Sequence, residues 1–255
     1  MRLAYDDAGR GDCVVLIHGH PFDRSLWQPQ VAALRPDFRV LVPDLRGFGE
    51  SPVTPGLVTM REYAADVEGL LDDLGITRAA VVGLSMGGLV TMELAVSQPQ
   101  RYWAIGLVAT TAEPPSPEER LIRRERAGAV EREGMVVLVD YMHTGLHGPA
   151  CPPAVRRRID AMMSAASPAG AAAALRGRAG RPDYRSALAS LGIPALVCAG
   201  TADPWSDQAV TDGILAWLKH PELILIDGAG HLPSLEAETE FNEALLTFLR
   251  THAPG

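Results

Sequence analysis

Three short apolar runs constrain the fold of this chain more than any other feature of its sequence. They read "VVLIHG" at 14–19, "RVLVPD" at 39–44 and "AAVVG" at 79–83, and each ends in turn residues. Their apolar character is continuous rather than alternating, which is typical of strands that a parallel sheet buries on both faces. We therefore expect these runs to form strands of a parallel sheet that is covered on both faces.

The clearest helix signal lies between the second and third runs, in "TMREYAADVEGLLDDLG" at 59–75. Thr59 and Glu62 have the spacing of a capping box, in which each side chain satisfies a free backbone N–H at the start of the helix. Apolar residues then recur at helical spacing, and Gly75 supplies a left-handed stop. Strands that alternate with helices in this way predict a doubly wound α/β sheet.

Strand character returns later in the chain, at 104–108, 193–200 and 222–227, and an amphipathic helix is expected near 238–250. We number the strand at 104–108 as the sixth.

The segment from 113 to 190 differs from the rest because it shows no convincing strand. Helices are expected at 117–134 and 152–167, and the most biased stretch reads "PAGAAAALRGRAGRPD". This segment is interpreted as a helical insertion over one end of the sheet. The expected organisation is a core of residues 1–111 and 191–255, with a helical cap of residues 112–190 inserted after the sixth strand.

Length and charge restrict the class of protein. The 255 residues are enough for one compact domain, and the formal net charge of −8 argues against nucleic-acid or anionic-membrane partners. No apolar run approaches the ~18 residues of a membrane helix, and residues 1–12 lack the apolar centre of a secretory signal. The three scattered cysteines favour free thiols in a reducing compartment. We therefore expect a cytoplasmic protein.

One hydroxyl stands at the end of the third apolar run. In "VVGLSMGGLV" at 81–90, Ser85 lies between a strand and a helix, with Gly83 and Gly87 two positions to either side. A strand that turns sharply into a helix presents its serine at the carboxyl end of the strand. Side chains at the two glycine positions would clash with the neighbouring backbone. Because the same pattern also occurs by chance, a nucleophilic role for Ser85 depends on finding its partners.

A serine hydroxyl needs a base, and the base needs an acid that orients it. Among the seven histidines, His231 follows the last strand and precedes the final helix, which places it at the carboxyl edge of the sheet. The candidates for the acid are Asp203, Asp207 and Asp212. Asp203 is preferred because it directly follows the strand at 193–200, whereas Asp207 fits the cap of the next helix better.

Acyl transfer to a serine also needs backbone donors for an oxyanion. The N–H of Met86 is expected to supply one, because it lies at a helix N-terminus where the dipole favours negative charge. The N–H of His20, in the turn "HGHPFD", is expected to supply the other. The His20 imidazole either points into the pocket or lines its wall, and the second reading is preferred.

With these residues in place, the chain resembles the α/β-hydrolase superfamily over nearly its whole length; the exception is the middle segment. The matching stretches are "HGHPFDRSLW" (18–27), "VPDLRGFGES" (42–51), "VVGLSMGGLV" (81–90), "AGTADP" (199–204) and "GAGHLP" (228–233). The resemblance implies the α/β-hydrolase fold, a mostly parallel sheet of about seven or eight strands flanked by helices, with the middle segment as a variable cap. Because the N-terminus is short, the outer antiparallel strand of the usual eight is expected to be missing.

The same resemblance implies roles for individual residues. Ser85 corresponds to the nucleophile, Asp203 to the acid and His231 to the base, in the order along the chain that α/β-hydrolases use. The amides of His20 and Met86 correspond to the oxyanion hole. Three further residues, Asp44, Arg46 and Gly47, correspond to a structural turn.

Within the superfamily the chain looks most like the 3-oxoadipate enol-lactonase group, and esterases and cofactor-free haloperoxidases are similar. We expect a serine hydrolase that cleaves small carboxylic esters or lactones through an acyl-enzyme at Ser85, without a cofactor. The alternatives are a cofactor-free perhydrolase and a receptor that only binds its ligand. Haloalkane dehalogenases and epoxide hydrolases are disfavoured because they carry an aspartate where Ser85 stands.

The cap is more basic than the core, with 12 arginines against nine acidic residues between 113 and 190. This balance is compatible with a substrate that carries a carboxylate, although solvated helix pairs such as Glu119 with Arg123 are the favoured explanation. His143 and His147 have the spacing of metal ligands, but no third ligand is nearby and no metal is expected. The sequence does not reveal the oligomeric state, and a homodimer is kept as an option.

Overall fold

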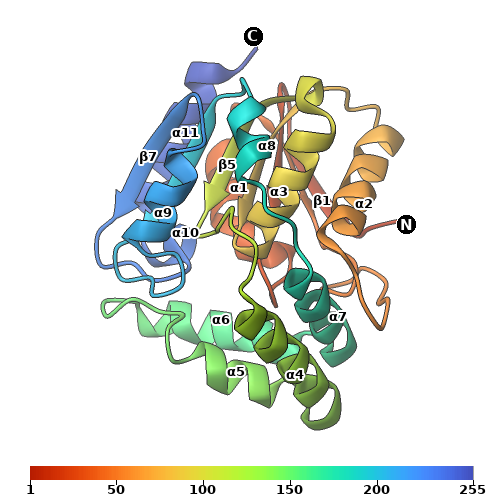
Figure 1. Ribbon diagram of the computed structural model, residues 1–255. Coiled ribbons are helices and arrows are strands. Elements are labelled where there is room, and N and C mark those ends of the chain that lie inside the picture. Colours follow the sequence, from red (N-terminus) through yellow and green to blue (C-terminus); the bar gives the residue numbers. More distant parts are fainter. Residues whose placement is uncertain (255) are drawn as a thin grey trace.

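The computed structural model describes residues 1–254 and contains one seven-stranded sheet, in the order β1-β3-β2-β4-β5-β6-β7 (Figure 1). The strands are β1 (Tyr5–Gly9), β2 (Cys13–Ile17), β3 (Arg39–Pro43), β4 (Ala79–Leu84), β5 (Tyr102–Val108), β6 (Ala195–Gly200) and β7 (Pro221–Ile226). All neighbours run parallel except β1, which pairs antiparallel with β3. The predicted doubly wound α/β sheet is confirmed.

Two expectations about the strands were wrong. An outer antiparallel strand is present, because β1 pairs with β3 from Tyr5 opposite Pro43 to Gly9 opposite Arg39. Its sequence, YDDAG, has no apolar run because an edge strand leaves most of its residues exposed. In addition, the strand that we numbered as the sixth is β5, the fifth strand of the chain. The numbers differ because only one strand, β1, precedes β2. The helical insertion therefore follows the fifth strand.

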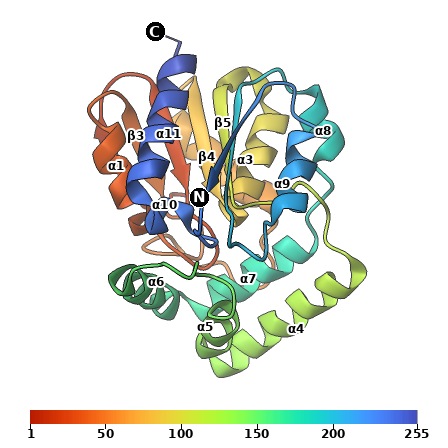
Figure 2. The same cartoon turned by 90° about the vertical axis from the view of Figure 1, so that its left-hand side faces the viewer.

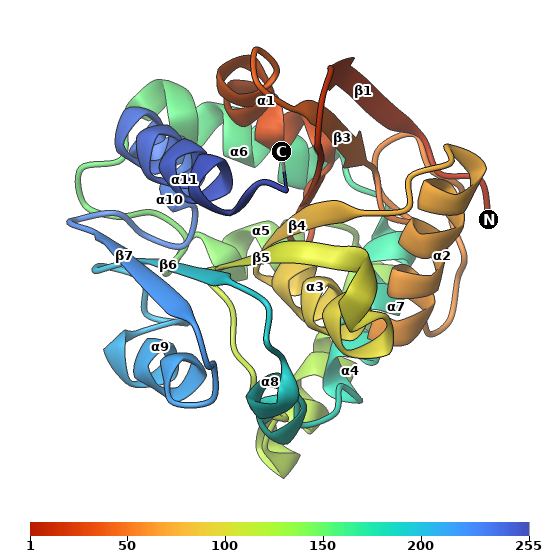
Figure 3. The ribbon, with the colours of Figure 1, turned by 90° about the horizontal axis from the view of Figure 1, so that it is seen from above.

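The sheet separates two hydrophobic clusters. In β2, Val14 and Leu16 belong to one cluster, whereas Val15 and Ile17 belong to the other. Helices α1 and α11 cover the first face, and α2, α3 and α9 cover the second (Figure 3). Burial on both faces explains why the runs that predicted these strands are continuously apolar.

The helices that flank the sheet include the two predicted at 59–75 and near 238–250. The full set is α1 (Gln28–Leu34), α2 (Met60–Asp73), α3 (Met86–Ser97), α8 (Arg185–Ser190), α9 (Gln208–Leu215), α10 (Pro233–Glu236) and α11 (Glu238–His252), with short 3-10 helices η1 (Arg24–Trp27) and η2 (Pro99–Arg101). The capping box of Thr59 and Glu62 opens α2, and Gly75 has a φ of +66° just after it. No helix within residues 1–254 is both long and apolar enough to cross a membrane.

Between β5 and β6, four further helices lie together below the sheet (Figure 2), before the chain returns through α8 beside α3. They are α4 (Pro117–Glu133), α5 (Val136–Met142), α6 (Pro153–Ala165) and α7 (Pro168–Ala179). The helices expected at 117–134 and 152–167 are confirmed as α4 and α6, whereas α5 and α7 were not expected. We use the word cap for residues 112–190, and this division from the core stays a prediction.

Helix α7 was missed because it has no polar face. Every residue from Gly170 to Leu175 is buried, so the helix shows none of the amphipathic pattern of a surface helix. Its glycines pack directly on the core backbone. A Cβ at Gly170 would lie 2.0 Å from the carbonyl oxygen of Gly47, and one at Gly177 would lie 1.8 Å from that of Val58. The cap is therefore docked on the core by close backbone contact.

Candidate active site

Ser85 occupies the sharp turn between β4 and α3. Its φ of 55° and ψ of −110° lie outside the regions that a non-glycine residue ordinarily adopts. A Cβ at Gly83 would lie 2.1 Å from the carbonyl oxygen of Gly87, and one at Gly87 would lie 2.2 Å from that of Ile17. The Thr110 hydroxyl also donates a 2.8 Å hydrogen bond to the backbone carbonyl of Ser85, within this turn. The steric reason for the flanking glycines is as the sequence predicted.

The structure brings Ser85, His231 and Asp203 together in one hydrogen-bonded chain. The Ser85 Oγ lies 2.9 Å from His231 Nε2, and His231 Nδ1 lies 2.7 Å from Asp203 Oδ2. Because an ionised carboxylate only accepts hydrogen bonds, Nδ1 carries the proton and Nε2 is left to accept the proton of the serine. This arrangement can deprotonate the hydroxyl while it attacks a substrate.

Asp203 is held as a carboxylate by the groups around it. Burial alone raises its pKa, but the charge of His231 and the hydrogen bonds from His231, Ser206 and Trp205 together outweigh burial, so the pKa lies below its ordinary value. The Ser206 hydroxyl and the Trp205 N–H also donate to this carboxylate, the latter at 2.8 Å. Ser206 was missed by the sequence reasoning. Its signal was a hydroxyl residue three positions after the acid, within "ADPWS".

The other candidates for the acid lie away from His231. Asp207 caps α9, where its side chain accepts the N–H of Val210 at 3.0 Å. Asp212 accepts a 2.7 Å hydrogen bond from the side chain of Gln208 on the same helix. Neither aspartate therefore takes the position beside the imidazole.

The two backbone amides expected to hold an oxyanion, those of His20 and Met86, are both available as donors. Met86 is the first residue of α3, and among residues 1–254 neither its N–H nor that of His20 donates to a protein acceptor. The His20 side chain does line the pocket, and its Nε2 donates to the carbonyl of Ala171 on α7 at 3.0 Å. Burial, aided by the charge of Arg178, lowers the pKa of His20 to about 3, so the ring is neutral.

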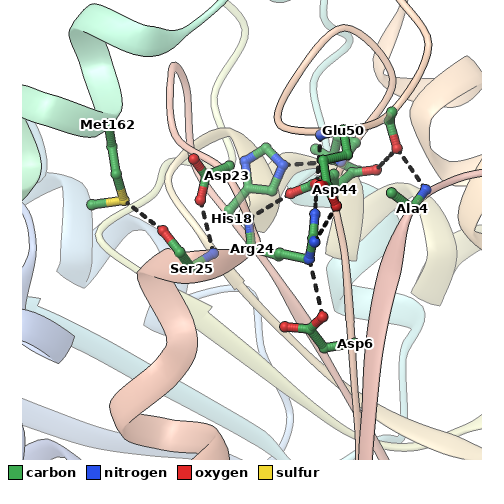
Figure 4. Close-up of polar contacts among 11 residues, drawn as sticks. Ala4, Asp6, His18, Asp23, Arg24, Ser25, Asp44, Glu50 and Met162 are labelled. Atoms are coloured by element: carbon green, nitrogen blue, oxygen red, sulfur yellow. Dashed lines mark hydrogen bonds and ion pairs between the residues drawn. The ribbon is translucent and has the colours of Figure 1, made fainter.

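The turn after β3 is organised around the buried carboxylate of Asp44 (Figure 4). Asp44 accepts the N–H of Arg24 at 2.7 Å and that of Glu50 at 2.9 Å, and it pairs with the Arg24 guanidinium. Beside it, the N–H of Leu45 donates to His18 Nε2 at 2.9 Å. None of these residues lines the cavity over Ser85. The stretch "VPDLRGFGES" thus has a structural place, as the resemblance implied.

A cavity of about 430 Å³ lies between the sheet and the cap, with Ser85 and His231 in its wall. Apolar and aromatic cap residues form much of the opposite wall: Ile122, Leu138, Tyr141, Met142 and Leu175. The Trp205 ring packs edge-on against the His231 imidazole, with their centroids 4.9 Å apart. Four arginines of the cap, Arg123, Arg126, Arg178 and Arg181, also line the cavity. The serine therefore faces a space of the size of a small ligand.

The histidine pair of the cap has other partners. His143 Nε2 lies 2.8 Å from a carboxylate oxygen of Asp160, and His147 Nε2 lies 3.9 Å from the same oxygen. Within residues 1–254 no group of three or more metal-ligating side chains has a geometry suited to an ion.

Comparison with known proteins identifies the family of the chain. The sequence matches the Alpha/beta hydrolase family over residues 14–244. It is 35% identical over 236 residues to 3-oxoadipate enol-lactonase 1 of Acinetobacter baylyi, which covers 90% of this chain and 85% of that protein. The structure is similar to a malate-bound thermophilic esterase from Thermogutta terrifontis, with a TM-score of 0.96, 38% identity, and coverage of 98% of this chain and 94% of that one. It is also similar to the enol-lactonase from Burkholderia xenovorans LB400, with a TM-score of 0.90, 30% identity, and coverage of 97% and 96%.

The fold and the serine at its strand-to-helix turn define the class of protein as an α/β hydrolase. With the family match covering most of its length, the chain belongs to the Alpha/beta hydrolase family. It is accordingly an enzyme of the hydrolase class.

Proposed function

We propose that this protein is a serine hydrolase that cleaves small carboxylic esters or lactones through an acyl-enzyme at Ser85. The observation that carries the proposal is the hydrogen-bonded chain from Ser85 through His231 to Asp203, with the serine facing a cavity of about 430 Å³. The names of its relatives, which include enol-lactonases and esterases, support this bond type.

The reaction follows from the positions of the groups. The Ser85 oxygen attacks the carbonyl carbon of the substrate while His231 Nε2 takes its proton, and the amides of His20 and Met86 hold the oxyanion that forms. His231 then gives the proton to the departing alcohol oxygen, which breaks the ester bond and leaves the acyl group on the serine. Water, deprotonated by His231, attacks the acyl carbon. The bond from that carbon to the Ser85 oxygen then breaks, His231 returns the proton to the serine oxygen, and the acid is released. Asp203 stabilises the imidazolium in both halves.

The substrate is a small molecule, and we infer that it carries a carboxylate. The cap contributes four arginines to the cavity wall, and of these Arg123 pairs with Glu119 at 3.1 Å in the way a solvated helix pair would. The remaining arginines favour an anionic substrate. We also infer a reducing, cytoplasmic compartment, since Cys13, Cys151 and Cys198 are all free and buried. A homodimer stays a prediction.

The test compares the wild-type enzyme with Ser85→Ala. We expect the wild type to hydrolyse p-nitrophenyl acetate and to be labelled by a fluorophosphonate, and the variant to lose labelling and at least about 10⁴-fold of its turnover. A wild-type enzyme that neither labels nor turns over esters would contradict the proposal. A ligand that raises the melting temperature without being consumed would then favour the receptor alternative.

The perhydrolase alternative uses the same residues and differs only in the second nucleophile, which is peroxide in place of water. Measuring peroxyacid formation from acetate and hydrogen peroxide separates the two reactions. We expect hydrolysis of the acyl-enzyme to exceed perhydrolysis when both nucleophiles are present.

A further inference from the structure

The cap wall of the cavity contains an unusual concentration of positive charge. Arg123 and Arg126 come from α4, Arg178 comes from α7, and Arg181 follows directly after α7. Helices α4 and α7 pack along each other, so the four guanidinium groups lie close enough for their charges to interact. Like charges that face one cavity repel each other, and folding alone does not explain why they are gathered there.

Arg178 is the most isolated of the four. Its side chain is half-buried, and among residues 1–254 it has no ion pair. Its Nε is fully buried without a hydrogen-bond partner. Burial, together with the charges of Arg123 and Arg181, lowers the pKa of Arg178 to about 9, and the group stays positively charged at neutral pH. A partly buried charge with an unpaired buried Nε is unfavourable, so its presence beside a cavity indicates a ligand that supplies the counter-ion.

The neighbours of Arg178 do not supply that counter-ion. The Arg126 guanidinium lies over the ring of Tyr141, 3.3 Å from its centroid, and Arg181 Nε donates to the backbone carbonyl of Glu113 at 3.0 Å. Arg123 has the carboxylate of Glu119 as its ion-pair partner. Arg126, Arg178 and Arg181 therefore line the cavity without a carboxylate partner. Of these three, only Arg126 and Arg178 also donate no side-chain hydrogen bond within residues 1–254.

The acidic residues of the wall do not neutralise these two groups. The wall contains Glu113 and Glu119, whereas Asp203 lies outside it. Glu119 pairs with Arg123, and Glu113 pairs with Arg185, which does not line the cavity. The charges of Arg126 and Arg178 are thus unmatched. A single carboxylate would leave one of them uncompensated, but a ligand with two negative charges would match both.

We propose that the substrate of this cavity carries two negative charges in addition to its ester or lactone bond, as two carboxylates or a phosphate monoester, and that Arg178 and Arg126 bind them. This proposal rests on the proposed function, because it takes the cavity at Ser85 to be where the substrate binds. It makes Arg178 the residue that sets specificity for the charge of the substrate. Ser85 and its partners in the core then determine the reaction but not the charge of the substrate.

The test is a charge series of equal size, measured by isothermal titration calorimetry on the full chain at constant ionic strength. Succinate, succinamate and succinamide carry two, one and no negative charges at about pH 8. We expect succinate to bind at least about tenfold more tightly than succinamate, since a buried guanidinium contact to a charged group typically gives that factor. The affinity of methyl phosphate, a phosphate monoester, is measured in the same way. Tighter binding of methyl phosphate than of succinate assigns a phosphate monoester, and the reverse assigns a dicarboxylate.

Three variants complete the test. In Arg178→Gln the preference for succinate over succinamate should fall to within about twofold, and Arg178→Lys should recover part of it because it retains the charge. Arg124→Gln is the control, since Arg124 is an exposed arginine of α4, the helix of Arg126, and lies outside the cavity; it should retain the full preference. Equal affinities for the three compounds in the wild type, or an unchanged preference in a folded Arg178→Gln, would overturn the proposal.

The calorimetric result does not depend on turnover. A wild-type enzyme that is labelled at Ser85 but shows no charge preference refutes the two-charge substrate and leaves the proposed function standing. An enzyme that binds succinate through Arg178 but is never labelled refutes the proposed function and retains the anion site.

Discussion

The core and the cap form opposite walls of one cavity and are built in different ways. On the core side, Ser85, His231 and Asp203 have one another as partners, at 2.9 Å and 2.7 Å. On the cap side, Arg126 and Arg178 face the same space without a carboxylate partner. The core wall is thus complete before a substrate binds, whereas the cap wall needs one. We infer that the core determines the reaction and the cap determines which molecule undergoes it.

The largest expected effect is on the core side, at Asp203. Asp203→Asn should lower kcat for p-nitrophenyl acetate by about 10⁴-fold, because an amide no longer holds the proton on His231 Nδ1. Asp207→Asn is the matched control and should change kcat by less than about twofold, since asparagine caps α9 as well as aspartate does. Steady-state kinetics of both variants decide the matter. Full activity in Asp203→Asn, or a large loss of activity in Asp207→Asn, would show that Asp203 is not the acid that orients His231.

The second prediction concerns the contact that joins the two walls. Gly177→Ala should lower the free energy of unfolding by about 3 kcal/mol, because its Cβ would lie 1.8 Å from the carbonyl oxygen of Val58. Gly69→Ala, in the interior of α2 with nothing within 4 Å, should raise it by about 0.5 to 1 kcal/mol. Urea unfolding measures both. If Gly177→Ala is as stable as the wild type, the cap is not docked by backbone contact.

The third prediction uses the pH dependence of stability at His20, where the two walls meet. In the unfolded chain a histidine gains a proton below about pH 6.5, whereas burial keeps His20 neutral in the folded protein down to its pKa of about 3. Between these values the unfolded state binds one more proton, so stability falls by about 1.4 kcal/mol for each pH unit lost. His20→Gln should remove this contribution. Urea unfolding at about pH 7 and pH 5 should therefore show a smaller loss in the variant, and equal losses would contradict the assignment.

The smallest expected effect compares the same motif in the two regions. Thr59→Ala in α2 of the core and Ser116→Ala in α4 of the cap each remove a capping box and should cost about 1 kcal/mol. Because α7 packs on the core backbone, we expect both variants to unfold in a single transition. A separate, earlier transition in Ser116→Ala, seen by circular dichroism, would indicate that the cap unfolds on its own.

The core could be predicted from the sequence because its constraints are local and steric. The runs that became β2, β3 and β4 are buried on both faces, and the glycines around Ser85 leave room only for backbone. Strand β1 could not be predicted in this way, because YDDAG is an edge strand defined by pairing with β3 and not by burial. Asp203 and His231 were predicted from their positions after strands, which a parallel sheet brings to one edge.

The cap wall could not be predicted to the same depth. Arg176 and Arg178 stand two residues apart in one helix, yet Arg176 pairs with Glu131 at 2.6 Å outside the cavity, and Arg178 lines it. Their difference depends on which face of α7 meets the cavity. Because α7 is alanine-rich and lacks an amphipathic pattern, the sequence does not reveal that face. The basic character of the cap was visible in the sequence, but the residue that carries it into the cavity was not.

The central claim is that Ser85 carries an acyl group during turnover, and trapping that group tests it most directly. The enzyme is mixed with p-nitrophenyl acetate, quenched with acid within its first turnovers, digested and mapped by mass spectrometry. We predict one acetyl group on the peptide that contains Ser85, and none on that peptide in Ser85→Ala. Ester hydrolysis by the wild type with no acetyl group at Ser85, or with one on a different side chain, would contradict the account.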